Sequence, residues 1–300
     1  MRILILGMNY LPESASIGPY TADLAEYLQK RGHQVRVVTS FPMAPQWRIW
    51  ESYRGEWFRR EIVNGILVTR TFIFVPREPR RAINRVLYDM SFSLSAIIGA
   101  LLSGPCDAIL AISPPLQIGV AGWLISKIRR VPFFFHIQDL VPDAAVATGL
   151  LTEKSTAVKI ARDLENYIYR RVHSISVICD GFRRNLLSKQ VPSSKIRLMP
   201  NYIDLEFMRS FPRANPFRTA HGFDEKDFLV MYSGSIALKQ GLTVLVDAAA
   251  ILKNEKDIKL VIIGEGPPLA DLKSRANELG LSNLFFLPFQ PRESLPQQLR

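Results

Sequence analysis

A chain of 300 residues, 48% hydrophobic and 22% charged, is globular and long enough for two α/β domains. Its two cysteines, Cys106 and Cys179, lie far apart, which excludes a disulfide scaffold and fits a reducing compartment. The net charge of +11 is uneven: residues 1–210 hold 27 Lys and Arg against 17 Asp and Glu, whereas residues 211–300 hold 11 against 10. A basic first part can face nucleic acid, anionic lipid or a phosphorylated acceptor. Because no nucleic-acid-binding motif accompanies the charge, we expect no nucleic-acid partner.

The chain begins with the strand, loop, helix and strand that open an α/β domain. We predict strands at residues 2–7 and 35–39 and a helix over about 19–30, with Gly18 at the mouth of the helix. The loop lacks the close glycine triplet of a dinucleotide fingerprint, so the sequence argues against NAD binding. No signal peptide is visible, since the apolar run after Arg2 is short and leads into a strand.

Residues 40–60 interleave prolines and three tryptophans with charged residues. A segment of this kind at the carboxyl end of a strand often lines a pocket, and a surface loop held by packed tryptophans explains it equally well. The alternating pattern of residues 66–75 predicts a further strand or one arm of a hairpin.

The arginines from Arg77 to Arg85 lead into the uncharged run 90–106, which has 17 residues. This is shorter than the roughly 20 residues that span a bilayer. The next uncharged run is broken by Pro114-Pro115 and reads as a strand, a turn and a helix. We therefore prefer a buried or interfacial helix flanked by arginines to a membrane span. A peripheral position on the cytoplasmic face of the plasma membrane is expected.

The stretch VPFFFHI at residues 131–137 predicts a central buried strand, and Gln138-Asp139 follow it. Ligands bind where parallel strands end, so His136 and Asp139 are candidate catalytic residues. Asp139 orients His136 or approaches an acceptor hydroxyl in this interpretation, and a simple turn or helix cap is the alternative. Single histidines are usually structural, and the other three are expected to be so.

A second βαβ unit fills the last third of the chain, with strands expected at 228–232, 259–263 and 284–287. We place the domain boundary after the turn-rich PNYID segment, giving domains at 1–205 and 206–300. Gly234 and Gly241 bracket the first loop of the unit. Loops of this kind present backbone N–H groups and a helix dipole to anions such as phosphates. Turn and cap glycines are the alternative explanation.

In order and spacing, these pieces resemble the retaining GT-B glycosyltransferases of family 4 type. The closest resemblance is to the bacterial N-acetyl-fucosamine transferases and colanic-acid glycosyltransferases of cell-surface polysaccharide synthesis. It covers nearly the whole chain and is carried by the stretches PESASIGPYTADLAEYLQKRGHQVRVVTSFPMAPQW, FHIQDLVPDA, PNYID, YSGSIALKQGL and IIGEGPPLADLKSRANELGLSNLFFLPFQP.

The resemblance implies two Rossmann-like domains facing across a cleft, with an acceptor-side loop at Ile17-Gly18 and with His136 contacting the donor sugar. It places the donor diphosphate and base on two loops of the second domain. The donor-binding residues implied are Gly234, Ser235, Lys239, Gln240, Gly264, Glu265 and Gly266.

Two departures from the family pattern matter. Ser235 and Gln240 stand where the general family has an arginine and a lysine, as in the fucosamine-transferase branch, and Lys239 is an adjacent cation. The family's second domain also continues for roughly another hundred residues, a domain-size expectation. The resemblance therefore implies an incomplete second domain, which we expect to be marginally stable and to leave this chain without detectable transfer. Its unfinished sheet should leave some apolar residues near an open edge or uncovered face, namely Val230, Leu260, Ile262 and Phe286.

No Asp-x-Asp pair occurs in the chain, so we expect no metal and no cofactor. Helix dipole, backbone N–H groups and a cation can neutralise a diphosphate leaving group without one. The expected reaction transfers a sugar, with retention, from a nucleotide-diphosphate donor (UDP-linked) to a lipid-linked, polyprenyl or oligosaccharide acceptor. Two alternatives stay open: a truncated, inactive nucleotide- or acceptor-binding module, and a nucleotide-sugar epimerase of the same architecture.

Overall fold

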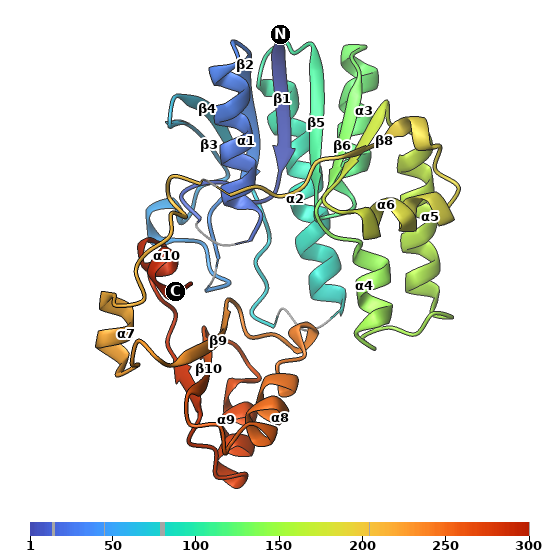
Figure 1. The fold of residues 1–300 in the computed structure, drawn as a ribbon. Coiled ribbons are helices and arrows are strands. Elements are labelled where there is room, and N and C mark those ends of the chain that lie inside the picture. The colour runs from blue at the N-terminus through green and yellow to red at the C-terminus, as the bar shows by residue number, and fades with distance from the viewer. Residues whose placement is uncertain (14–15, 45, 79–81, 204, 300) are drawn as a thin grey trace. The chain divides into compact units, whose positions relative to one another are not determined.

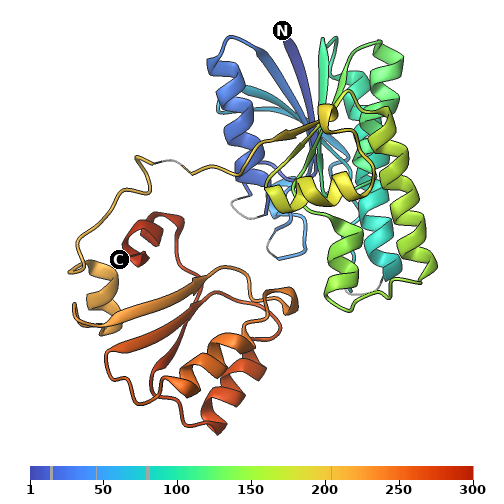
Figure 2. The same cartoon turned by 45° about the vertical axis from the view of Figure 1, so that its right-hand side comes forward.

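The computed structural model describes residues 1–13, 16–44, 46–78, 82–203 and 205–299. The chain divides into two compact units, Met1–Tyr202 and Ile203–Arg300, whereas the sequence placed the boundary at residue 205 (Figures 1 and 2). Each unit has its own sheet and core, so each is described separately.

The first unit is built on an eight-stranded sheet in which all neighbours are parallel except β3 and β4. The strand order is β3-β4-β2-β1-β5-β6-β7-β8, so the winding direction reverses between β1 and β5. A ligand is expected beyond the carboxyl ends of the strands at such a reversal. The strands are β1 (Arg2–Gly7), β2 (Gln34–Ser40), β3 (Phe58–Val63), β4 (Ile66–Thr71), β5 (Ala108–Ser113), β6 (Phe133–Ile137), β7 (Ser174–Val177) and β8 (Ile196–Leu198).

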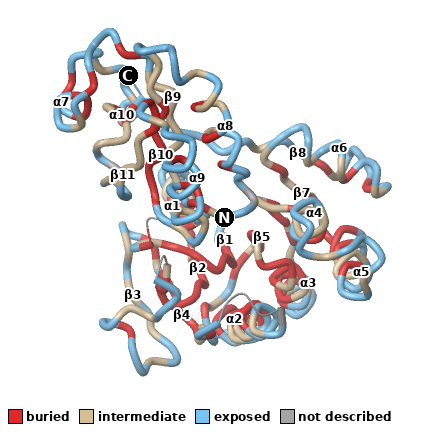
Figure 3. The backbone as a smooth tube through the Cα atoms, turned by 90° about the horizontal axis from the view of Figure 1, so that it is seen from below, coloured by how far each residue is buried: buried red, intermediate tan, exposed pale blue. Residues whose placement is uncertain are grey.

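Helices cover both faces of this sheet, because alternate residues of the buried strands point to opposite sides. Leu4 and Leu6 pack in one cluster together with residues of α2 and α3, while Ile5 packs in another with residues of α1. Figure 3 shows the buried backbone running through β1, β2 and β5. The helices are α1 (Gly18–Lys30), α2 (Ala82–Leu102), α3 (Ile118–Arg129), α4 (Val141–Ala147), α5 (Thr156–Arg171) and α6 (Asp180–Ser188), with short 3-10 turns η1 (Glu51–Tyr53) and η2 (Ser193–Lys195).

Helix α2 buries one face and exposes the other. Phe92, Ala96 and Ala100 are buried in the core, whereas Leu94 and Ile98 are 57% and 61% exposed. Residues 83–102 are long and apolar enough to cross a bilayer, and they are the part of the described chain that passes this test. Because one face of α2 packs inside the unit, α2 is a partly buried helix, and an interfacial position stays a prediction.

The second unit has a three-stranded parallel sheet of order β11-β10-β9. Its strands lie where the sequence predicted them. The elements are α7 (Pro216–His221), β9 (Phe228–Ser233), η3 (Leu238–Gln240), α8 (Thr243–Ile251), β10 (Ile258–Ile263), α9 (Leu269–Glu278), β11 (Leu284–Leu287), η4 (Arg292–Ser294) and α10 (Leu295–Gln298).

The expectation that Leu260 and Ile262 lie near an open edge or uncovered face is wrong. They are 1% and 0% exposed, because β10 is the central strand and α8 and α9 cover them. On the other face Val261 and Ile263 are buried against Phe217 and the loop that follows α7. The flanking positions Val230 and Phe286 are only partly buried. The strands β9 and β11 therefore pair with both edges of β10, and residues of the helices and of the loop after α7 cover both of its faces.

Candidate functional site

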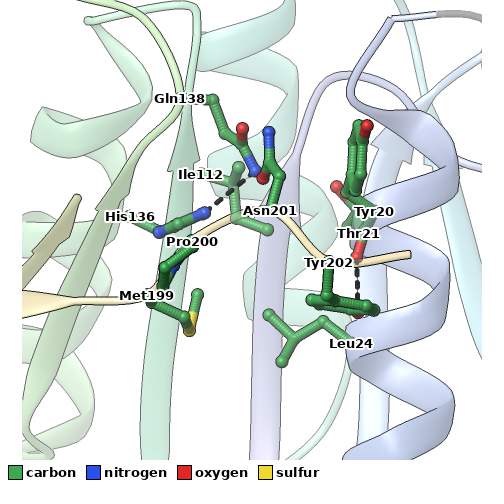
Figure 4. Close-up of a pocket in the computed structure, with 10 residues that line it drawn as sticks. All are labelled: Tyr20, Thr21, Leu24, Ile112, His136, Gln138, Met199, Pro200, Asn201 and Tyr202. Atoms are coloured by element: carbon green, nitrogen blue, oxygen red, sulfur yellow. Dashed lines mark hydrogen bonds between the residues drawn. The ribbon is translucent and has the colours of Figure 1, made fainter. Parts of the chain in front are cut away.

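A narrow pocket lies at the carboxyl edge of the first sheet, beside the reversal between β1 and β5 (Figure 4). It has room for a group about the size of a water molecule. Tyr202 passes over α1, and its hydroxyl donates to the Tyr20 carbonyl at 3.5 Å. Burial raises the pKa of Tyr202 to about 12, so this phenol keeps its proton. The lining residues are Tyr20, Thr21, Leu24, Ile112, His136, Gln138, Met199, Pro200, Asn201 and Tyr202.

His136 lines this pocket, yet its ring is enclosed. The residue is 2% exposed, and its Nδ1 lies 2.9 Å from Ser176 Oγ. Its Nε2 lies 2.9 Å from Gln138 Nε2 (Figure 4). Burial lowers the pKa of His136 to about 4, and the hydrogen bond with Ser176 opposes the shift. The imidazole is therefore neutral at physiological pH, so a role as general acid is disfavoured.

Asp139 lies half-buried between β6 and α4. The hydrogen bonds of the His136 ring go to Ser176 and Gln138, so these two residues orient the ring in place of Asp139. The catalytic role of Asp139 stays a prediction. Sequence reasoning missed Gln138, although a residue two positions after His136 near a strand end projects to the same side.

The acceptor-side loop is shaped by a close approach of backbone at Gly18, the first residue of α1. A Cβ there would lie 3.1 Å from the Glu13 carbonyl oxygen and 3.4 Å from the Tyr10 nitrogen. Ile17 is the N-cap residue and packs partly buried against the core on the α1 side. These two residues hold the loop on the helix, and an acceptor contact by them stays a prediction.

Glu13 and Arg70, which sequence reasoning did not single out, fix the surrounding loops. The Glu13 carboxylate is 1% exposed and accepts from the Met43 and Ala44 backbone N–H groups at 2.6 and 2.7 Å. Arg70 is fully buried and donates to the Ser40 carbonyl, the Leu11 carbonyl and the Glu61 carboxylate. For Arg70, a charged residue in the otherwise uncharged strand 66–71 was the available sequence signal.

In the second unit, the two glycine loops meet through their backbones. Gly234 N donates to the Ile263 carbonyl and Ile236 N to the Glu265 carbonyl, each at 2.9 Å. A Cβ at Gly264 would lie 1.9 Å from the Gly234 oxygen, and one at Gly266 would lie 1.8 Å from the Ile236 oxygen. The glycines at 264 and 266 are therefore required for this contact, whatever else the loops bind.

The remaining donor-loop candidates are exposed on the same loops. Ser235, Gln240 and Glu265 all face solvent within this unit, and the Lys239 side chain lies outside the described residues. Gly241 has φ +58 with open space around it, as expected of the glycine that ends η3. The described chain contains no group of three or more His, Cys, Asp and Glu residues that could hold a metal ion. Whether His136 faces these loops stays a prediction.

Gly266→Ala should destabilise the second unit by at least about 3 kcal/mol, because the added methyl overlaps the Ile236 carbonyl. Gly280→Ala is the control, since Gly280 has φ +61 but no neighbour within 4 Å of its Cβ position, and it should lose only about 1 kcal/mol. Hydrogen exchange over residues 228–287 measures both. Equal losses of stability in the two variants would show that glycine is required at position 266 for its backbone conformation and not for the contact between the loops.

The neutral state of His136 should also appear in the pH dependence of stability. Its folded pKa lies below its unfolded value of 6.5, so its contribution is complete above pH 6.5 and is lost as the pH falls toward 4. From pH 7.5 to 4, the wild type should lose about 3 kcal/mol relative to His136→Gln. Urea unfolding followed by tryptophan fluorescence reports on the first unit, because all four tryptophans lie in it.

Comparison with the variant at each pH is needed because Asp89 titrates in the same interval with the opposite sign. Burial raises the pKa of Asp89 to about 6, so this carboxyl stabilises the folded state as the pH falls. Its contribution is common to both proteins and cancels in the difference. Parallel stability curves for wild type and His136→Gln would contradict the neutral, buried state of His136.

Comparisons with known proteins agree with this architecture. A family model described as "Glycosyl transferase 4-like domain" matches residues 16–202, and one described as "Glycosyl transferases group 1" matches residues 214–300. An Escherichia coli (strain K12) protein named as a colanic acid biosynthesis glycosyl transferase, WcaI, is 30% identical over 306 residues, covering 100% of this chain and 74% of that protein.

Two further relatives are more distant. The alpha-monoglucosyldiacylglycerol synthase of Streptococcus pneumoniae (strain ATCC BAA-255 / R6) is 23% identical, covering 94% of this chain and 60% of that protein. The crystal structure of Anabaena HepE in complex with UDP and glucose superposes with a TM-score of 0.66 at 18% identity, covering 100% of this chain and 71% of that one. The family models and the identity with WcaI therefore show that this chain belongs to the glycosyltransferases, and its two α/β units match the structures of their GT-B class.

Proposed function

We propose that this chain acts in the transfer of a sugar, with retention, from a nucleotide-diphosphate donor to a lipid-linked or oligosaccharide acceptor of cell-surface polysaccharide synthesis. The observation that carries the proposal is the alignment of the whole chain with WcaI, which includes both units. The donor is proposed to be UDP-linked, since HepE was crystallised with UDP and glucose on the same fold.

The chemistry of the two units supports this assignment. Retaining transfer needs a leaving diphosphate to be stabilised and sugar hydroxyls to be held, and backbone N–H groups can do the first without a metal ion. In the second unit, Gly234 and Ile236 use their N–H groups to join the two loops, while the described residues offer no acceptor to the N–H of Ser235. This N–H is a candidate for the diphosphate, followed closely by α8 and the positive end of its dipole.

The decisive experiment incubates the purified chain with a panel of UDP-sugars and an undecaprenyl-diphosphate-linked sugar acceptor. Release of UDP from one donor that depends on the acceptor would support the proposal and would overturn the expectation from the sequence that this chain shows no detectable transfer. NMR of the product should then show the donor's anomeric configuration, and turnover should persist in EDTA, because backbone N–H groups and a helix dipole can neutralise the diphosphate without a metal. UDP binding without release would favour a binding module, and conversion of the UDP-sugar without acceptor would favour an epimerase.

We also propose that the α2 face contacts the cytoplasmic surface of an anionic membrane. Exposed apolar side chains recur on α2 at steps of three or four residues, and the only charged residue between 86 and 102 is the buried Asp89. Arg77 precedes α2, and Arg85 lies in its first turn, where it pairs with Asp89 at 3.7 Å. The exposed residues at these steps are Ile83, Leu87, Met90, Leu94, Ile98 and Leu101, and Val86 and Leu102 beside them are exposed as well.

Basic residues also gather at the other end of α2. Arg129 donates to the Ala100 and Leu101 carbonyls at 2.8 and 3.0 Å, and Arg60 donates to the Leu102 carbonyl. These arginines satisfy the last carbonyls of the helix and bring positive charge to its carboxyl end. An apolar helix face with cations at both ends fits an interfacial position on anionic lipid.

Replacing Leu94 and Ile98 by glutamine should weaken binding to phosphatidylglycerol vesicles by at least tenfold, since two exposed apolar side chains leave the interface. Sedimentation with vesicles measures the effect. Ile160→Gln is the control, because Ile160 on α5 is 62% exposed, close to the 61% of Ile98, but lies on another helix. Replacing Arg77 and Arg85 by glutamate should weaken binding most at low salt. Unchanged binding in both variants would exclude α2 as the contact.

A further inference from the structure

The pocket in the first unit is built for a small polar group without charge. It has room for a water-sized group, and its lining contains amides, hydroxyls, apolar side chains and one neutral imidazole (Figure 4). The Thr21 hydroxyl is already donated to the Ile17 carbonyl. The Tyr20 carbonyl accepts from Tyr202. The polar side chains that remain to recognise a ligand in the pocket are the Tyr20 hydroxyl and the amides of Gln138 and Asn201, and of the two amides Gln138 is the one bonded to His136.

His136 cannot make this contact without giving up a bond that it already has. Its ring nitrogens are engaged by Ser176 and Gln138, both at 2.9 Å, and the residue is almost completely buried. A buried imidazole nitrogen left without a partner is unfavourable, so exchange of Gln138 for a ligand carries a penalty. The His136 ring is therefore held by its own hydrogen bonds and is not the group that contacts a ligand in the pocket.

The hydrogen bonds also determine where the protons lie. A Gln138 N–H donates to the lone pair of His136 Nε2, so the neutral ring carries its proton on Nδ1 and donates it to Ser176 Oγ. With its nitrogen held by the ring, the half-buried Gln138 amide is fixed in one orientation (Figure 4). Its oxygen is then an acceptor on the side away from His136.

We propose that Gln138 is the residue of the first unit that accepts a hydrogen bond from a carbohydrate hydroxyl, and that His136 is a positioning residue that orients the Gln138 amide. A hydroxyl is the sugar group that matches a water-sized, uncharged pocket with a fixed carbonyl acceptor. The assignment rests on the proposed glycosyltransferase function for the identity of the ligand. The His136–Gln138 pair itself does not depend on that function.

The pair is tested by NMR of the full chain labelled with ¹⁵N histidine, in which the four imidazoles are assigned with a His136→Gln variant. We expect His136 to be neutral, with the proton on Nδ1, at pH 5 to 8. In Gln138→Glu a carboxylate replaces the amide beside Nε2 and should raise the pKa of His136 by more than about one unit. A proton on Nε2 in the wild type, or an unchanged pKa in Gln138→Glu, would overturn the proposal.

The ligand is tested with Gln138→Met, which keeps the length of the side chain and removes its amide. Gln29→Met is the matched control, because the Gln29 amide also donates one hydrogen bond, to the Gly65 carbonyl at 2.9 Å, but does not line the pocket. Calorimetry with UDP-glucose and with UDP should show a loss of about three- to tenfold for UDP-glucose alone, the effect of one hydrogen bond. The control should bind both probes like the wild type.

A second probe, a farnesyl-diphosphate-linked N-acetylglucosamine, distinguishes whether the hydroxyl belongs to the donor sugar or to the acceptor sugar. A loss confined to this probe would also support the proposal and would assign the hydroxyl to the acceptor sugar. Unchanged binding of both sugar probes by Gln138→Met would overturn the role of Gln138. A wild-type chain that binds none of the probes would overturn the proposed function instead, and the titration of His136 would still decide the pair.

Discussion

The parallel sheet of the first unit brings its loops to one edge, and buried charged residues hold those loops in place. Arg70 joins the loop after β1 to the end of β2 and to β3, through the Leu11 and Ser40 carbonyls and the Glu61 carboxylate. Glu13 joins the same first loop to residues 43 and 44. A buried charge that loses its partner destabilises a protein by several kcal/mol. The loops that follow β1 and β2 are therefore constrained together at this edge of the sheet.

In the second unit the constraint is a steric one. The carbonyls of Gly234 and Ile236 occupy the space that side chains at Gly264 and Gly266 would take. Close packing of the two loops joins the ends of β9 and β10 and leaves Ser235 and Glu265 at the surface of this unit. The glycines thus serve the geometry of the edge, while any ligand contact is left to the backbone groups and exposed side chains between them.

Elements with strong local patterns were predictable from the sequence. The run VPFFFHI is apolar at nearly every position, as a strand covered on both faces must be, and its last five residues form β6. Partners that depend on tertiary packing were not predictable. Ser176 reaches His136 because β7 pairs with β6, with Ser176 opposite His136 in the register, and no spacing in the sequence encodes that pairing. Leu260 and Ile262 were misplaced because the expectation considered the number of strands and not the central position of β10.

The basic charge of the first part of the chain and its pocket are separate features. The residues that line the pocket include none with a formal charge, since the imidazole of His136 is neutral. Arginines gather instead at the two ends of α2, where they donate to helix carbonyls or stand beside the exposed apolar face. Charge acts over a Debye length and suits attraction to an anionic surface, whereas an amide held by a buried imidazole selects a group by position and hydrogen bonding. The proposed membrane contact thus depends on charge at the ends of α2, whereas the proposed recognition of a hydroxyl depends on one oriented amide in an uncharged pocket.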